Sequence, residues 1–169
     1  MTTYVAVLKR LQVDRVVTDA LLSRAGLHGA QFPGLILTVR PLSGSLKETE
    51  VHFRTHDAQT LLNKPSDLPH YAGLAAMRAQ VQQPADHWSV LVTGSATRPD
   101  AVLKRDNAVI AVEFDAGYRY RVVKQKMRAF EDYDAVIWGT TSALRAARLR
   151  AMYPAVQVLT VDYWTATQT

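Results

Sequence analysis

The chain has 169 residues and a formal net charge of +5, and its 48% hydrophobic and 21% charged side chains are typical of a soluble globule with a good core. No run approaches the roughly 20 apolar residues of a membrane span, and the N-terminus lacks a signal-peptide pattern, so we expect a cytoplasmic protein without a membrane partner. The absence of cysteine excludes disulfides, thiolate nucleophiles and cysteine zinc sites, which leaves Mg²⁺ or Mn²⁺ on oxygen or imidazole ligands as the natural metal candidates.

The chain opens with two predicted helices. Apolar residues at helical spacing predict the first over 4–12, and the second follows over 19–25, with Thr18 as its N-cap and Gly26 as its stop. This is a helix-turn-helix-like opening. Glycine and proline then crowd the stretch in which a third, recognition helix would lie.

A predicted hairpin follows the helices. An apolar run at 35–40 and an alternating run at 50–54 are joined by a glycine- and serine-containing loop, and residues 57–62 predict a closing helical turn. The pattern resembles the wing of a winged-helix module, which would span residues 1–66. The alternative is a helical hairpin packed on a β-ribbon without any role in nucleic-acid binding.

Two prolines and several polar residues at 63–69 predict a boundary, after which residues 67–169 predict a second domain. The run at 108–114 is almost continuously apolar, which indicates a strand buried on both faces. The predicted elements are a helix at 70–82, strands at 87–93, 99–103 and 108–114, a helix at 118–131, a strand at 135–139, a helix at 141–152 and a strand at 156–161.

Three acidic residues stand at the ends of these predicted strands. Asp100 begins the second strand, and Glu113 and Asp115 end the third. Carboxylates that meet at strand ends, with a lysine nearby, can hold a divalent metal against a phosphodiester. The alternative is structural, in which Asp100 caps a turn and the other two acids pair with Arg119 or Arg121.

Basic residues gather around these acids in the sequence, and such an excess suits a polyanionic partner because neutralising phosphates releases counterions. We therefore expect DNA as the partner. The candidate DNA-binding residues are Arg98, Lys104, Arg105, Arg119, Arg121, Lys124 and Arg128.

Aromatic residues have two expected uses. Tyr118, Tyr120 and Tyr133 could stack on bases, as in many nucleic-acid-binding proteins. Trp88 and Trp138 lie in strand-like apolar runs and are expected to fill the core.

The order of helix, three strands, helix and strand is similar to the core of the PD-(D/E)XK nuclease superfamily, which carries acids on its second and third strands. Within it the chain resembles the replication-relaxation family of plasmid and mobile-element proteins. The family's pattern is matched by His70 at the start of a helix, by Pro-Asp-Ala-Val-Leu at 99–103, by Glu-Phe-Asp-Ala-Gly at 113–117, and by Lys126 four residues before Phe130.

The resemblance implies a restriction-endonuclease-like mixed sheet flanked by helices, preceded by the winged-helix-like module. It also implies Mg²⁺- or Mn²⁺-dependent cleavage of DNA, with Asp100, Glu113 and Asp115 as metal ligands. The superfamily's usual lysine, two residues after the strand acid, is replaced here by Asp115. With Met127 on the inward stripe of the following helix, Lys126 lies closer to the inward face than Lys124 and is the better catalytic candidate.

A different class of function remains open. The chain could be a non-catalytic DNA-binding or regulatory protein, possibly a homodimer, that keeps the nuclease core as a scaffold. A third reading is a protein-interaction module of a mobile element. The helix before the strands carries no carboxylate at the place where many such nucleases have an extra metal ligand, which weakens the catalytic reading.

Overall fold

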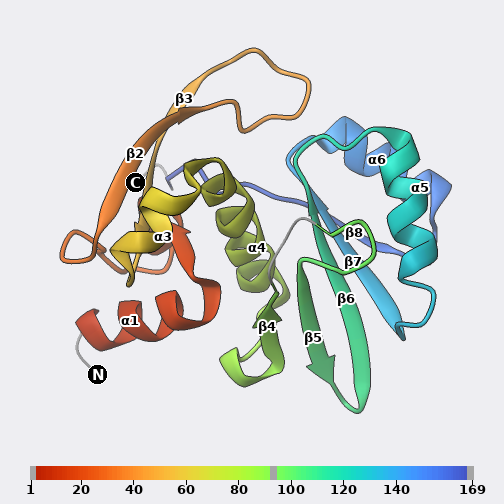
Figure 1. Cartoon of the computed structure of the whole chain (residues 1–169), viewed down its shortest axis with the longest axis horizontal. Helices are drawn as coiled ribbons and strands as arrows, with labels where there is room; N and C mark the ends of the chain where they lie inside the picture. The colour runs from red at the N-terminus through yellow and green to blue at the C-terminus, as the bar shows by residue number, and fades with distance from the viewer. Residues whose placement is uncertain (1–2, 92–94, 167–169) are drawn as a thin grey trace.

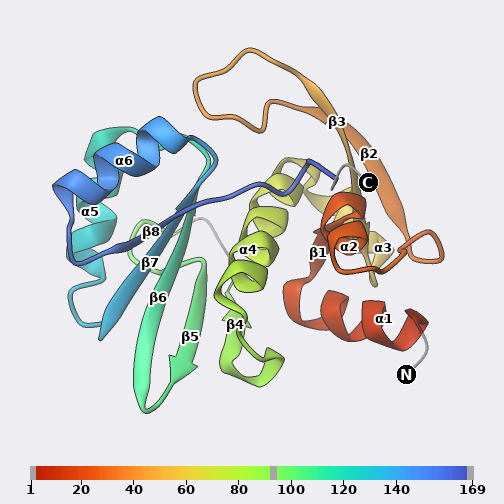
Figure 2. The ribbon, with the colours of Figure 1, turned by 180° about the vertical axis from the view of Figure 1, so that it is seen from behind.

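The computed structural model describes residues 3–91 and 95–166. Figures 1 and 2 show a small three-stranded module on one side and a five-stranded sheet on the other, with helix α4 between them. In the described part of the chain no helix is long and apolar enough to cross a membrane.

The N-terminal module consists of α1 (Thr3–Asp14), β1 (Val16–Thr18), α2 (Asp19–Arg24), β2 (Gly34–Val39), β3 (Thr49–Thr55) and α3 (Ala58–Asn63). Its strands form an antiparallel sheet in the order β1-β3-β2. The side chain of Thr18 caps α2 by accepting from the Leu21 amide, and Gly26 follows with a positive φ of 68° that few other residues adopt.

The predicted helices and hairpin of this module are therefore confirmed, whereas β1 was not predicted. Residues 27–33 form no helix, so the position of a recognition helix is occupied by a loop. The tip of the β2–β3 hairpin reaches the other half of the molecule, where the Ser43 amide donates to Thr141 Oγ1 at 3.0 Å. This wing packs on its own protein at that point.

A short 3₁₀ turn, η1 (Pro65–Asp67), leads into α4 (Leu68–Val81), the helix that joins the two halves. Most of α4 is buried, and its small residues let other elements approach closely. A Cβ added to Gly73 would lie 2.5 Å from the ring of Phe114. Because α4 contacts both sheets, one continuous apolar core runs across the predicted boundary at residues 66–67.

The second half contains η2 (Ala85–His87), β4 (Trp88–Val90), β5 (Ala101–Arg105), β6 (Ala108–Asp115), α5 (Tyr120–Ala129), β7 (Ala135–Thr140), α6 (Ala143–Met152) and β8 (Gln157–Thr160). Its sheet has the order β4-β5-β6-β7-β8, in which the first three strands are antiparallel and β6, β7 and β8 are parallel. The predicted mixed sheet flanked by helices is thus confirmed. The predicted strand at 87–93 extends into residues 92 and 93, which lie outside the described residues.

Helices cover both faces of the large sheet. The α4 side is filled by residues such as Met77 and Phe114, and the opposite side, under α5 and α6, is filled by Val123, Trp138 and Leu149. The two parallel crossovers place α5 and α6 on the same face. Strand β6 is the central strand of this sheet, and its side chains Glu113 and Asp115 lie on the face that α5 covers.

Candidate functional site

Two carboxyl groups meet beneath α5. The Asp100 amide donates to the carbonyl of Val112 at 3.0 Å, and the next residue, Ala101, opposes Val112 in the antiparallel register of β5 and β6. This register places Asp100 beside Glu113. Their exposed fractions are only 2% and 0%, so the site is a pair of acids inside the protein.

A lysine from α5 reaches this pair. The Nζ atom of Lys126 lies 2.9 Å from Glu113 Oε1 and donates to the carbonyl of Ser95 at 3.0 Å, and the residue is 5% exposed. Its ammonium group also lies 5.6 Å from the centre of the Tyr118 ring. Lys124, by contrast, is exposed. The helix therefore brings Lys126, and not Lys124, to the acids.

Glu113 is buried beside two other ionisable groups. Its Oε1 atom lies 2.9 Å from Lys126 Nζ, and the register of β5 and β6 places Asp100 next to it. Burial raises the pKa of Glu113 to about 9, the negative charge of Asp100 adds to the effect, and the charge of Lys126 opposes it. In the protein alone this carboxyl group is held protonated at neutral pH.

Asp100 behaves in the opposite way. Its Oδ2 atom accepts from the Phe114 amide at 2.9 Å and lies 2.9 Å from His70 Nε2. Burial by itself would raise the pKa of Asp100, but the adjacent His70 and the Phe114 amide outweigh burial and hold the pKa below its ordinary value. The two acids are therefore split into one ionised and one protonated group.

His70 and Tyr118 belong to this cluster but were not among the predicted site residues. His70 lies in the first turn of α4 and contacts Asp100 from there. In the sequence, its match to the family pattern was the signal that pointed to it. Burial, with the acidic groups of the cluster nearby, raises the pKa of Tyr118. No pattern in the sequence distinguishes this tyrosine from its neighbours.

Asp115 has a different environment. Its Oδ1 atom accepts from the Gly117 and Tyr118 amides at 2.7 and 2.6 Å, and its Oδ2 atom accepts from Trp138 Nε1 at 3.2 Å and from two nitrogens of Arg145 within 2.8 Å. A carboxylate with this many donors has little capacity left for a metal. We therefore correct the expected role of Asp115 from metal ligand to structural anchor of the loop and of α6.

The salt-bridge alternative also needs correction in its partners. Arg119 and Arg121 are exposed, and within residues 3–91 and 95–166 neither makes an ion pair with Glu113 or Asp115. The remaining predicted DNA-binding residues are likewise exposed, namely Arg98, Lys104, Arg105, Lys124 and Arg128. These basic residues thus lie on the surface of the protein.

The acids do not form a complete preorganised metal site. Among the described residues no group of three or more histidine, cysteine or carboxylate side chains is arranged to hold a metal ion. What remains is the pair Asp100 and Glu113. Mg²⁺ is commonly held by one or two carboxylates together with water and substrate phosphates, so a pair is compatible with that ion.

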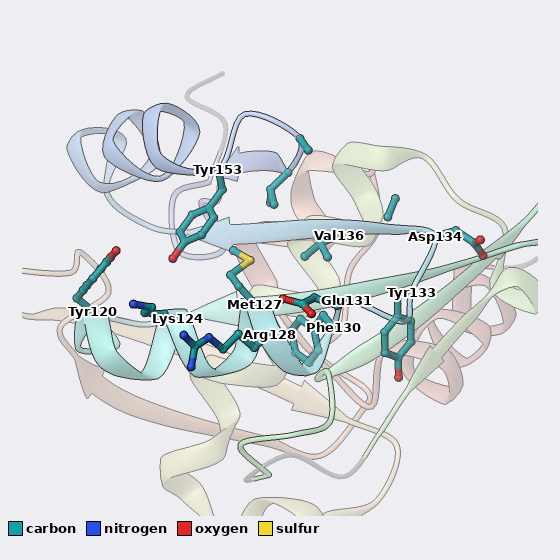
Figure 3. Close-up of a pocket in the computed structure, with 13 residues that line it drawn as sticks. Tyr120, Lys124, Met127, Arg128, Phe130, Glu131, Tyr133, Asp134, Val136 and Tyr153 are labelled. Carbon is teal, nitrogen blue, oxygen red and sulfur yellow. The ribbon is translucent and has the colours of Figure 1, made fainter.

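A groove of about 570 Å³ lies on the outer side of α5 and includes neither Asp100 nor Glu113. Figure 3 shows its lining, in which tyrosines surround Met127 and basic side chains follow one edge. The groove and the carboxyl pair are therefore two separate features on α5. No protein-family model, curated protein or solved structure matches this chain, so the functional argument is carried by the geometry of the molecule.

Proposed function

We propose that the protein is a metal-dependent nuclease that hydrolyses DNA phosphodiester bonds at Asp100, Glu113 and Lys126. The carrying observation is that Asp100, Glu113 and Lys126 are brought together inside the protein, with Lys126 Nζ 2.9 Å from Glu113 Oε1. Burying ionisable groups costs free energy, and a folded protein retains such a cluster mainly where it serves another purpose.

A divalent cation supplies that purpose. The carboxyl oxygens of Glu113, once deprotonated, and the ionised carboxylate of Asp100 would be hard oxygen ligands of the kind that Mg²⁺ and Mn²⁺ prefer, and the chain offers no thiolate to compete. A cation held by these two residues would lower the pKa of a bound water and offset negative charge on the phosphate.

The protein side chains have distinct roles in this proposal. Lys126 is fixed by its contacts with Glu113 and the Ser95 carbonyl, and its ammonium group would stabilise the negative charge that develops on the phosphate or on the leaving oxygen. His70 keeps Asp100 ionised and oriented. The low exposure of the cluster strengthens each of these electrostatic effects because little water screens them.

Two further observations support DNA as the substrate. Arginine and lysine side chains on β5 and α5 are exposed and can neutralise phosphates. The order of elements and the two acids also resemble the PD-(D/E)XK superfamily, with Lys126 from α5 in place of the usual strand lysine. The N-terminal module, which lacks a helix at 27–33, would contribute the β-ribbon rather than a recognition helix.

The test is incubation of supercoiled, relaxed, linear and single-stranded DNA with purified protein in Mg²⁺, Mn²⁺ or EDTA. Wild-type protein should cut only with metal, and Asp100→Asn and Glu113→Gln should abolish cutting while leaving the circular-dichroism spectrum unchanged. Asp86→Asn removes an acid whose side chain is 81% exposed, and it should cut like the wild type.

Intact DNA in every arm would overturn the proposal. If calorimetry then showed no Mn²⁺ binding by the wild type, while DNA affinity still fell with rising salt, the non-catalytic DNA-binding reading would replace it.

A further inference from the structure

The groove on the outer side of α5 has a floor and walls contributed by three segments. They are α5 with the turn after it, the start of β7, and the residues that follow α6. Figure 3 shows Tyr120 and Tyr133 near its two ends, Met127 between them, and Tyr153 reaching in from the segment after α6. A volume of about 570 Å³ is within the range of sites that bind small organic groups.

The three tyrosines offer flat aromatic surfaces. Tyr120 is 58% exposed, which is unusual for so large a ring. It lies in the same groove as Tyr153, and Tyr133 packs edge-on against Phe130 with ring centres 6.0 Å apart. This contact holds the Tyr133 ring in place, so little side-chain entropy would be lost when a flat ligand stacks on it.

One edge of the groove is positively charged. Lys124 and Arg128 lie one turn apart on α5, both are exposed, and within the described residues neither has an ion-pair partner. Of the two acids that line the groove, Asp134 is already engaged by the Val109 amide at 2.6 Å, and Glu131 lies in the middle of the lining near Met127 and Phe130, so two cations stand against one remaining acid. The cationic edge is therefore available for an anion beside the aromatic walls.

A flat ring next to an anion is the chemistry of a nucleotide. We propose that this tyrosine groove binds an unpaired segment of a nucleic-acid strand, with bases on the tyrosines and phosphates at Lys124 and Arg128. In a duplex the faces of the bases are covered by their stacked neighbours, so only an unpaired strand presents them. An apolar peptide would satisfy the rings but would leave the two cations without a partner.

The groove inference rests on the proposed function for its class of partner, a nucleic acid, but it does not depend on cleavage. Lys126 points from α5 toward Glu113, whereas Lys124 and Arg128 line the outer groove of the same helix. One helix thus contributes to both features. The substrate class that fits is DNA with a single-stranded part next to the bond that is cut.

The test measures binding in EDTA, which removes metal-dependent cleavage. Fluorescence anisotropy would compare single-stranded DNA, single-stranded RNA and duplex DNA, each of about 12 nucleotides. Wild-type protein should bind at least one single strand about tenfold more tightly than the duplex. Tyr120→Leu should weaken that binding about tenfold, and Tyr120→Phe, which keeps the aromatic face, should leave it within about twofold.

Charge is tested in the same assay. The double variant Lys124→Gln/Arg128→Gln should lower single-strand affinity and reduce the slope of log affinity against log salt by about 1.4. The matched double variant Lys9→Gln/Lys64→Gln removes two exposed lysines that lie outside the β2–β3 ribbon, and it should change neither quantity. Thermal unfolding of each variant checks that the fold is retained.

Photocrosslinking locates the strand directly. An oligonucleotide with 5-iodouracil should crosslink to Tyr120, Tyr133 or Tyr153, as read by mass spectrometry. Equal binding of duplex and single strands, an unchanged affinity of Tyr120→Leu, or crosslinks confined to other residues would overturn the groove inference. Those results would leave metal-dependent cleavage intact, whereas intact DNA in the cleavage assay with normal groove crosslinks would overturn only the nuclease proposal.

Discussion

Glu113 and Asp115 lie two residues apart on the same face of β6, yet the protein treats their carboxyl groups in opposite ways. Asp115 accepts hydrogen bonds from two amides, an indole and a guanidinium group. Glu113 is equally buried, but its close neighbours are the ammonium group of Lys126, 2.9 Å from Oε1, and a second acid, Asp100. Both sit inside the protein, so burial alone does not distinguish them.

The difference separates a carboxyl group that stabilises the fold from one that costs stability. The donors of Asp115 tie the loop after β6 to β7 and α6, and they offset the desolvation of its charge. Lys126 compensates Glu113 only in part, because burial and the charge of Asp100 outweigh it, and Glu113 is protonated instead. A sequence pattern that contains both acids therefore contains one structural residue and one candidate for chemistry.

The largest expected effect follows from removing Asp115, the acid whose buried charge is offset by hydrogen bonds. Asp115→Ala should lower the free energy of unfolding by about 3–5 kcal/mol, because it leaves Arg145, Trp138 Nε1 and two amides without their acceptor. Urea unfolding measures the change, and Asp132→Ala, at an exposed acid, provides the control. A loss below about 1 kcal/mol would mean that Asp115 is not the anchor that its contacts indicate.

The buried lysine should show the reverse, with a large effect on activity and a small one on stability. Lys126→Met should reduce the cleavage rate by about 10²- to 10³-fold, since it removes a preorganised positive charge from the reacting phosphate. Its unfolding free energy should stay the same or rise, because the variant no longer buries an ammonium group. Lys9→Met, at an exposed lysine on α1, should cut at the wild-type rate.

The pH dependence of stability tests Glu113 without any substrate. The carboxyl group keeps its proton up to about pH 9 in the folded protein, whereas it releases the proton near its ordinary pKa of 4.5 in the unfolded chain. Between these values the folded state binds more protons, so the stability that this group contributes is complete below pH 4.5 and is lost as the pH rises toward 9.

Glu113→Gln keeps the shape of the protonated group and cannot ionise. In EDTA, the wild type should therefore lose stability relative to this variant as the pH rises from about 5 to about 9, with a total change on the order of a few kcal/mol. Urea unfolding at three pH values gives the difference. A constant difference across the range would show that Glu113 is ionised in the folded protein.

The comparison also shows which parts of the molecule could be predicted from the sequence. Every α-helix and strand that the structure describes in the second half was predicted, because apolar runs, turns and caps are local signals, whereas the 3₁₀ turn η2 was not. The placement of Lys126 at the acids follows from the 100° step of a helix, which is also local. β1 was missed because its three residues carry no period of their own and become a strand only by pairing with β3.

Long-range pairing set the limit of prediction. The partner of Asp115 is Arg145, 30 residues later, and not the nearer Arg119 or Arg121. That choice depends on how α6 packs against the end of β7, which the composition of neither segment reveals. The burial of Glu113 beside Asp100 and Lys126 is equally a property of the packed protein. The sequence could therefore not assign opposite roles to the two acids of β6.

The smallest expected effect follows from replacing His70, which lies beside the ionised Asp100. His70→Gln removes the imidazole that lies 2.9 Å from Asp100 Oδ2, while the Phe114 amide still donates to the same oxygen. Because one of the two groups that favour the ionised carboxylate remains, Asp100 should lose only part of its affinity for metal. We expect Mn²⁺ binding, measured by calorimetry, to weaken about tenfold, which is the lower end for residues that orient a metal ligand.

His87→Gln, at a histidine whose side chain is 45% exposed, should leave Mn²⁺ affinity unchanged. An unchanged affinity for His70→Gln would show that the Phe114 amide alone suffices to hold Asp100. A complete loss of Mn²⁺ binding would instead identify His70 as a metal ligand in its own right. In that second case Glu113, on β6, would share the metal with His70 as well as with Asp100.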